Sequence, residues 1–582
     1  MIVLRCYLFA LSLLFAPCCL AQGVSLAPEA ESGRSEKGLV IAHKDMVVAA
    51  HPLAAEAGRE MLRKGGSAVD AAIAVQMVLG LVEPQSSGLG GGAFIVHWDR
   101  ASKAVTTFDG RETAPASAKP DRFLDASGNT IAFDTAVRSG LSVGVPGVVR
   151  ALEMAHRKFG KLPWATLFEP ARKLAREGFP VGERLNALLT IEGPDRFPET
   201  ARHYFFDEAG APRAVGSLLR NPEYEATLAR IAKEGAGVFY EGDIAQDIVD
   251  AVAQAPFASG GMTVADVNGY QSKEREATCF AYRMRKICGM PPPSSGTLTV
   301  AQTLKLIEPL GGVEGKNARM APQAVHLIAE AEKLAFADRN RYIADPDFVT
   351  VPRGFLDAGY VAERRNLIGR ATTMEKPQAG LPPGVSKRTF GIDGTHEQHG
   401  TSHISIVDAD GNALSMTTTI ESAFGSHLMT HGFLLNNELT DFSFRPAGDD
   451  GVPAANRVEG NKRPRSSMAP LIVFAPDGQL YAVTGSPGGS RIILFMVKTL
   501  VALIDWDMNA SEAAALENFG SEGGPVQLEE GVSDFWLTLV LKSYGQEVVH
   551  MPMTSGIHTI VRRDGRLEGG ADPRREGIAL GD

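Results

Sequence analysis

The sequence predicts an α+β fold or a layered sandwich, and two patterns carry that prediction. Helical periodicity dominates the chain before residue 371, whereas alternating patterns typical of strands gather after residue 400. Helical and strand patterns do not alternate along the chain, which argues against a repeated βαβ unit. With 44% hydrophobic and 22% charged residues, the 582-residue chain can bury a large core and is not intrinsically disordered.

Four segments before residue 371 are expected to be helices. Apolar residues recur at helical spacing over 46–66, and a glycine pair ends that helix. Residues 68–81 are apolar on almost every face and predict a buried helix. Further helices are expected over 151–159 and 324–342.

Strands and turns are expected after a polar, proline-rich linker at 371–398, which we expect to be exposed. Each strand is short and bounded by turn residues such as Asp, Gly and Asn. A long apolar helix is expected to begin near Ser490. The strands are expected in two pairs, 401–407 with 413–420 and 471–474 with 480–483.

The first 21 residues resemble a secretory signal peptide that is cut after Ala21. A weakly basic start precedes an apolar run at 7–16, and small residues stand at the positions that a signal peptidase reads. The alternative is a membrane anchor, but a helix needs about 20 apolar residues to span a bilayer. We therefore expect a secreted or periplasmic protein that makes no membrane contact after this segment is removed.

Export permits a disulfide between the two cysteines that remain, Cys279 and Cys288. A two-residue turn at Arg283 and Met284 makes a hairpin in which these cysteines face each other directly. Met284 is, however, a poor residue for such a turn. These observations allow either a disulfide or two buried free thiols.

Charge and glycine spacing argue against nucleic acids and nucleotides as ligands. The chain has 58 Lys and Arg against 68 Asp and Glu, and a net charge of −10 does not suit nucleic-acid binding. The glycine-rich segment at 88–92 follows a helix and lacks the acidic residue of a dinucleotide-binding unit. The glycine turn around Gly488 lacks the Lys-Ser/Thr pair of a phosphate loop. We expect no cofactor and no metal.

The linker is followed by Gly400 and then by Thr401, which stands at the start of an expected strand. If the Thr401 hydroxyl attacks the Gly400–Thr401 peptide bond and the product is hydrolysed, Thr401 becomes a new N-terminus. Its α-amine, with a free pKa of about 7.7–8.0, can then act as the base for its own hydroxyl. The neighbouring Ser402 gains no such amine. A Gly-Thr pair alone is also ordinary at the start of a strand.

A set of motifs in a fixed order gives this junction its context. The chain resembles the γ-glutamyltransferase (γ-glutamyltranspeptidase) family over nearly its whole length after the signal segment. The motifs that carry the resemblance are GGSAVDAA at 65–72, EPQSSGLGGG at 83–92, FDGRETAP at 108–115, SVGVPG at 142–147, PPPSSG at 291–296, ADR at 337–339, GTSHIS at 400–405, NN at 436–437, DFS at 441–443, NKRPRSSM at 461–468 and TGSPGGSR at 484–491.

The resemblance implies a four-layer αββα sandwich, the fold of the N-terminal-nucleophile (Ntn) hydrolases, made by two chains from one precursor. It implies self-cleavage between Gly400 and Thr401 into a large subunit, 22–400, and a small subunit, 401–582, which remain associated as a heterodimer. It also implies transfer of a γ-glutamyl group from glutathione or a similar donor to water, an amino acid or a peptide.

The resemblance further assigns ten site residues. Thr401 is the nucleophile and Thr419 its hydrogen-bonding partner, and the amides of Gly488 and Gly489 would bind the oxyanion. The donor's α-carboxylate and α-ammonium need partners of opposite charge, and a forked guanidinium suits a carboxylate. The expected partners are Arg111, Ser466 and Ser467 for the α-carboxylate, and Asp441, Glu438 and Glu421 for the α-ammonium.

Two other functions remain open. A glutaryl amide acylase of the cephalosporin type would share the fold, but a glutaryl group lacks the α-ammonium that Asp441 and Glu438 would bind. A noncatalytic binding relative would lack Thr401 or the anchoring residues, and all of these are present. The segment between Asp441 and Ser466 is short and has no tyrosine, so we expect an open pocket without an aromatic lid.

Overall fold

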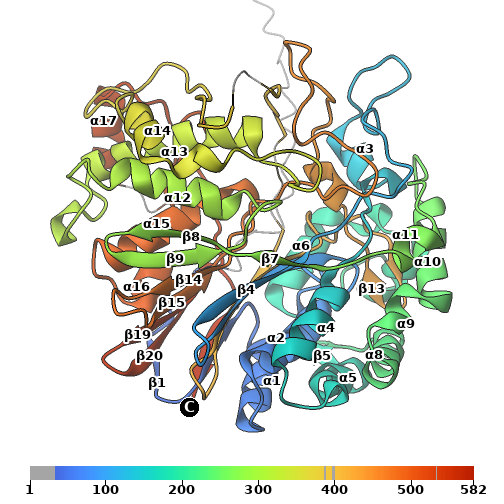
Figure 1. Cartoon of the computed structure of the whole chain (residues 1–582). Coiled ribbons are helices and arrows are strands. Elements are labelled where there is room, and N and C mark those ends of the chain that lie inside the picture. Colours follow the sequence, from blue (N-terminus) through green and yellow to red (C-terminus); the bar gives the residue numbers. More distant parts are fainter. Residues whose placement is uncertain (1–32, 386–388, 396, 398–399, 532–533) are drawn as a thin grey trace, which may run out of the picture.

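Two seven-stranded antiparallel sheets face each other in the middle of the molecule, and helices cover the outer face of each (Figure 1). This computed structural model describes residues 33–385, 389–395, 397, 400–531 and 534–582. The layers follow the order helix, sheet, sheet, helix, so the expected αββα sandwich of the α+β class is confirmed. The segment predicted as a signal peptide lies outside the described residues.

The two sheets differ in where their strands come from in the sequence. One sheet, in spatial order, contains β1 (Val40–Ala42), β20 (Arg566–Ala571), β19 (His558–Arg563), β15 (Leu480–Gly485), β14 (Leu471–Phe474), β9 (Arg285–Gly289) and β8 (Thr278–Tyr282). The other contains β21 (Ile578–Gly581), β2 (Met46–Ala49), β10 (Ser402–Val407), β11 (Ala413–Thr419), β3 (Gly92–Asp99), β4 (Ala104–Gly110) and β7 (Lys273–Glu276). Both sheets therefore mix strands from the two sides of the Gly400–Thr401 bond.

Each sheet has its own set of covering helices (Figure 1). The sheet that holds β10 is covered by α1 (Pro52–Arg63), α2 (Ala68–Val82) and α4 (Val148–Phe159). The sheet that holds β15 is covered by α12 (Gly296–Ile307), α15 (Ile492–Ile504) and α16 (Ala510–Ala515), and α13 (Pro322–Tyr342) packs on α12. Further helices surround this core: α3 (Phe133–Val137), α5 (Glu169–Glu177), α6 (Glu183–Glu192), α7 (Glu199–Phe205), α8 (Pro222–Glu234), α9 (Gly237–Tyr240), α10 (Gly242–Ala253), α11 (Val264–Asn268), α14 (Ala358–Arg365) and α17 (Phe535–Ser543).

Most of the predicted elements are confirmed within one to three residues. The helices expected over 68–81, 151–159 and 324–342 are α2, α4 and α13. The apolar helix expected near Ser490 is α15, and a single 3₁₀ turn precedes it. The four expected strands are β10, β11, β14 and β15. All four are buried on both faces, because they lie between a helix layer and the opposite sheet.

The helix predicted over 46–66 is wrong in its first third. Met46–Ala49 forms β2, which pairs with β10 on one side and β21 on the other, and the helix begins only at Pro52. Proline is well suited to the first turn of a helix but disfavours helical geometry in the residue before it. His51 caps this helix, since its Nδ1 accepts a hydrogen bond of 3.2 Å from the amide of Leu53.

The linker predicted over 371–398 has no helix or strand among its described residues, as expected, but its exposure was predicted only in part. Its first residues are exposed or half-buried. Near its end, Asp393 and Glu397 are buried, at 1% and 5% exposure. Ion pairs explain this burial, because Arg465 approaches Asp393 at 3.0 Å and Arg339 pairs with Glu397. These two linker residues therefore belong to the interior.

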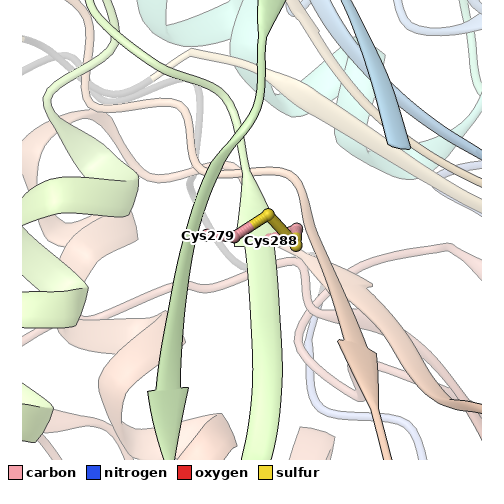
Figure 2. The surroundings of a disulfide bond; sticks show 2 residues. All are labelled: Cys279 and Cys288. Atoms are coloured by element: carbon pink, nitrogen blue, oxygen red, sulfur yellow. A yellow bond between two sulfur atoms is a disulfide. The ribbon is translucent and has the colours of Figure 1, made fainter. Parts of the chain in front are cut away.

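The hairpin predicted between the two cysteines forms as expected and carries a disulfide between Cys279 and Cys288 (Figure 2). β8 pairs with β9 so that these two residues face each other, with their Cα atoms 4.1 Å apart. Both turn residues, Arg283 and Met284, take left-handed backbone conformations, with φ of 47° and 61°. The disulfide, and not the pair of free thiols, is the state observed.

Over the ranges that the structure describes, no helix combines the length and the apolar character needed to span a bilayer. The apolar helix α15 is instead buried between β15 and the surrounding helices.

Candidate active site

The strand junction brings the predicted site residues around one small cavity of about 20 Å³. Thr401 directly precedes β10, and β11 ends beside it at Thr419, because the two strands pair Ser402 with Thr418. Gly488, the residue before Gly489, is the one predicted site residue outside the lining. The other nine line the cavity: Arg111, Thr401, Thr419, Glu421, Glu438, Asp441, Ser466, Ser467 and Gly489.

The Gly400 carbonyl oxygen accepts hydrogen bonds from two threonine hydroxyls. Thr419 Oγ1 donates to it at 2.6 Å, and Thr401 Oγ1 donates to it as well. Thr419 is itself held in place, since the amide of Glu421 donates to Thr419 Oγ1 at 2.7 Å. On the far side, Arg575 Nη1 donates to the Thr401 carbonyl at 3.2 Å. The Thr401 hydroxyl therefore lies next to the Gly400–Thr401 bond, and the Thr419 hydroxyl polarises the carbonyl group of the same bond.

The glycine-rich segment at 88–92 packs its backbone closely against this site. A Cβ atom on Gly91 would lie 2.0 Å from the carbonyl oxygen of Thr419, and one on Gly90 would lie 2.1 Å from that of Leu434. Real Cβ atoms do not approach so closely, so a side chain at Gly91 would push the end of β11 away, and one at Gly90 would displace the backbone at Leu434. Gly91 therefore positions Thr419.

Arg111 is fully buried directly after β4 and pairs with two carboxylates. Its Nη1 donates to Glu438, and its Nη2 donates to Asp441 Oδ2 at 2.5 Å. Backbone carbonyls of Pro464 and Arg465 accept further hydrogen bonds from the guanidinium, at 3.2 and 2.8 Å. Burial alone would lower the pKa of Arg111, but Glu438 and Asp441 outweigh it and raise that pKa. The guanidinium is thus a fixed positive charge.

Acidic groups outnumber this one guanidinium. Burial raises the pKa of both Glu438 and Asp441 well above the ordinary values, although Arg111 opposes the shift. Burial also raises the pKa of the neighbouring Glu112 to about 8. Glu421 adds a fourth carboxyl group, whose Oε2 accepts a hydrogen bond of 2.5 Å from Asn437. A cluster of this kind gains stability from a bound cation such as an ammonium group.

The two predicted serines belong to a loop that the start of α12 holds in place. The Ser295 amide donates to the Ser466 carbonyl at 2.7 Å, and the Ser466 amide donates to the Pro293 carbonyl at 3.1 Å. Ser467 Oγ donates to the Glu397 carboxylate and accepts a hydrogen bond of 2.6 Å from Arg339. The Glu397 carboxylate thus accepts the hydrogen bond that the Ser467 hydroxyl is predicted to donate to a substrate carboxylate.

Gly488 and Gly489 form the turn between β15 and α15. Gly488 has φ of 140°, which L side chains rarely adopt, and a Cβ there would lie 2.6 Å from the Phe495 ring. Glycine is therefore required at this position for both conformational and packing reasons. The turn brings Gly489 to the cavity that contains Thr401.

Some charged residues in or beside the cavity were not predicted as site residues, among them Glu112, Arg339 and Glu397. Burial opposes ionisation of Glu397, yet Arg339 and Arg465 hold its pKa below the ordinary value. Glu112 and Arg339 stand inside motifs that carry the resemblance, so the sequence could have indicated that they lie near the site. Glu397 lies in the aperiodic linker, where no sequence pattern marked it. Within the described residues, no group of three or more His, Cys, Asp or Glu is arranged to hold a metal.

Comparisons with known proteins agree with this geometry. The family model described as gamma-glutamyltranspeptidase matches residues 54–582. The glutathione hydrolase proenzyme of Bacillus subtilis is 36% identical over 550 residues, which are 92% of this chain and 91% of that protein. The glutathione hydrolase proenzyme of Escherichia coli is 36% identical over 582 residues, which are 97% of this chain and 96% of that protein.

A solved structure extends the comparison to the fold. Cephalosporin acylase from Bacillus halodurans superposes with a TM-score of 0.81 at 24% identity, covering 95% of this chain and 98% of that one. This similarity shows a shared fold and nothing finer. Because the family model and both proenzymes cover nearly the whole chain, this protein is an enzyme that belongs to the γ-glutamyltranspeptidase family.

Proposed function

We propose that this enzyme cleaves itself between Gly400 and Thr401 and then hydrolyses or transfers γ-glutamyl groups through an ester on Thr401. Glutathione is the proposed donor, because relatives covering almost the whole chain are glutathione hydrolase proenzymes. One observation carries the proposal: the hydroxyls of Thr401 and Thr419 both donate to the Gly400 carbonyl oxygen.

Self-cleavage begins with attack of Thr401 Oγ1 on the Gly400 carbonyl carbon. Negative charge develops on the carbonyl oxygen, where the Thr419 hydroxyl already donates a hydrogen bond. The C–N bond breaks, a C–O ester bond forms, and the hydroxyl proton passes to the nitrogen of Thr401. Water then hydrolyses the ester, which leaves a carboxylate on Gly400 and a free α-amine on Thr401.

Cleavage also supplies room for the substrate. The cavity of about 20 Å³ in the uncleaved chain holds about one water molecule and has no space for a glutamyl group. Gly400 and Glu397 form part of its wall, and Glu397 accepts the hydrogen bond of the Ser467 hydroxyl. Departure of this segment after cleavage would vacate both the acyl position and the carboxylate position. The uncleaved chain is therefore proposed to be inactive.

In the proposed catalytic cycle, the freed Thr401 amine takes the proton of Thr401 Oγ1, which attacks the γ-carbonyl carbon of the donor. The amides of Gly488 and Gly489 are proposed to stabilise the oxyanion. Collapse of the intermediate expels the leaving amine, which takes the proton, and leaves the γ-glutamyl ester. Water or an acceptor amine then attacks that ester and regenerates Thr401.

Donor recognition is proposed to rest on opposite charges at the two ends of the glutamyl α-carbon. Arg111, Ser466 and Ser467 would bind the α-carboxylate, and Asp441, Glu438 and Glu421 would bind the α-ammonium. The excess of buried carboxyl groups favours a donor that brings a positive charge. A glutaryl amide acylase is the second candidate, since the fold is shared with a cephalosporin acylase. A glutaryl group would leave those acidic residues without a cation.

One gel and one assay test the proposal. Full-length protein, purified after export, should run as two chains on a denaturing gel, with N-termini at Gln22 and Thr401. Thr401→Ala should stay whole and release no p-nitroaniline from γ-glutamyl-p-nitroanilide. An uncut wild-type protein that releases p-nitroaniline would overturn the mechanism. Faster release from glutaryl-p-nitroanilide than from the γ-glutamyl compound would favour the acylase function instead.

A further inference from the structure

A second and much larger cavity, of about 710 Å³, opens beside the site. The two cavities share two walls. The end of the linker contributes Gly394 and Thr395 to the larger cavity and Glu397 to the smaller one, which Gly400 also lines. The short helical turn Glu438–Asp441 and the residues after it likewise face both: Thr440 and Ser443 line the larger cavity, and Asp441 lines the smaller.

Arg341 gives the larger cavity a buried positive charge. It stands in the last turn of α13, lines the cavity and is only 4% exposed. Its Nη1 donates to the Phe390 carbonyl at 3.1 Å, whereas its buried Nε has no hydrogen-bond partner among the described residues. No described carboxylate forms an ion pair with it. A buried charge without a counter-charge is costly, so this cavity favours an anionic ligand.

The remaining walls set the shape of that ligand. Phe444 stacks between Phe123 and Phe133, with ring centroids 4.4 and 5.8 Å apart, and this stack makes a rigid apolar wall. The other charged side chains are at the exposed rim, where Arg445 pairs with Asp449 at 2.8 Å. The cavity therefore suits a small molecule that combines a carboxylate with an apolar or peptide portion.

The proposed reaction needs a place for such a molecule, and this inference rests on that proposed function. A γ-glutamyl donor has two halves, and the small cavity accounts only for the glutamyl half. The other half of glutathione is cysteinylglycine, which carries a carboxylate. Amino acid and dipeptide acceptors carry one too, and they attack from the side on which the leaving amine departed. We propose that the larger cavity binds the leaving peptide or acceptor, with Arg341 binding its carboxylate.

The experiment compares two acceptors that differ only in that carboxylate. γ-Glutamyl-p-nitroanilide is the donor, and glycylglycine and glycylglycinamide are the acceptors. A hydrogen bond to a charged group contributes about 1.5–3 kcal/mol, so the wild-type kcat/KM should favour glycylglycine by about 10- to 100-fold. Arg341→Gln should bring this acid-to-amide ratio close to one, and Arg341→Lys should restore part of it.

Arg445→Gln is the matched control, because it removes a positive charge from the exposed rim of the same cavity. The acid-to-amide ratio should stay near the wild-type value in this variant. A wild type that uses both acceptors equally would overturn the subsite, and so would equal losses of the ratio in both variants. If Arg341→Gln does not fold, the acid-to-amide ratio of the wild type still tests whether the cavity binds an acceptor carboxylate. A folded wild type that releases no p-nitroaniline would overturn the proposed function itself.

Discussion

The side-chain hydroxyl of Thr419 donates a 2.6 Å hydrogen bond to the carbonyl oxygen of Gly400, at the bond proposed to be cleaved. This contact is in place before any reaction, because the pairing of β10 with β11 and the close packing of Gly91 position Thr419. A donor that is already aligned with a developing oxyanion needs no rearrangement during the reaction.

Thr419→Val should therefore slow self-cleavage while keeping the shape of the side chain. Loss of one oxyanion donor slows such reactions by about 10²- to 10³-fold. Thr419→Ser keeps the hydroxyl and serves as the control. The fraction of uncut chain, followed over time on a denaturing gel, measures the effect. Cleavage of Thr419→Val at the wild-type rate would show that this hydrogen bond does not assist the reaction.

Glu397→Gln should also slow self-cleavage, through the position of the linker. The Glu397 carboxylate binds Arg339 and Ser467, four residues before the bond, and so holds the linker end in the site. Hydrogen bonds between charged groups contribute about 1.5–3 kcal/mol, so cleavage should become about 10- to 100-fold slower. Glu375→Gln, which changes an exposed linker residue, is the control. Equal cleavage rates of the two variants would contradict this role.

The errors in predicting the fold have a common physical origin. The sequence predicts a helix over residues 46–49 because a strand buried on both faces shows no polar alternation that would distinguish it from a buried helix. The strands at 401–407 and 413–420 were recognisable because a clear Asp-Gly turn joins them. Alternation over 401–407, together with the turn residues that follow it, made these central strands predictable.

The site was predictable where motifs mark it and not where distant charges meet. The resemblance that the motifs carry identified nine of the residues that line the small cavity, Thr401 among them. Glu397 and Arg341 could not be found in this way, because each depends on what lies opposite in the folded chain. Glu397 is buried by Arg339 and Arg465, and Arg341 lines the larger cavity without a carboxylate partner among the described residues.

Arg111→Met should strongly destabilise the uncleaved protein. The change would leave Glu438 and Asp441 buried without their guanidinium, and removal of one partner of a buried ion pair costs about 3–5 kcal/mol. Arg445→Met breaks an exposed pair and should cost at most about 1 kcal/mol. Urea unfolding in a Thr401→Ala background, where no cleavage occurs, compares the two. Equal unfolding free energies would contradict the stabilising role of Arg111.

Cys279→Ser should lower stability without disturbing the core. Cys279 is the exposed partner of the disulfide and Cys288 the buried one, so this change breaks the bond and leaves the buried side chain in place. For a loop of this length the lost constraint on the unfolded chain is worth roughly 2–3 kcal/mol. A reductant should lower the unfolding midpoint of the parent protein and leave that of Cys279→Ser unchanged. A reductant effect of the same size in both would contradict the assignment.

His51→Asn should make stability less sensitive to acid. Burial lowers the pKa of His51 to about 4, against an ordinary value of 6.5, although Glu83 opposes the shift. Between these two values the unfolded chain binds a proton that the folded chain does not, so stability falls as the pH falls from 6.5 to 4.

Asparagine can still cap α1 with its side-chain oxygen but does not titrate, so this contribution to acid sensitivity should disappear. The shift of His51 corresponds to about 2–3 kcal/mol between pH 7 and pH 4.5. Urea unfolding at both pH values, in the Thr401→Ala background, measures it. His203→Asn is the control, because the His203 side chain is 77% exposed and caps no helix. If His51→Asn loses as much stability on acidification as that control, the neutral His51 cap is not a source of the acid sensitivity.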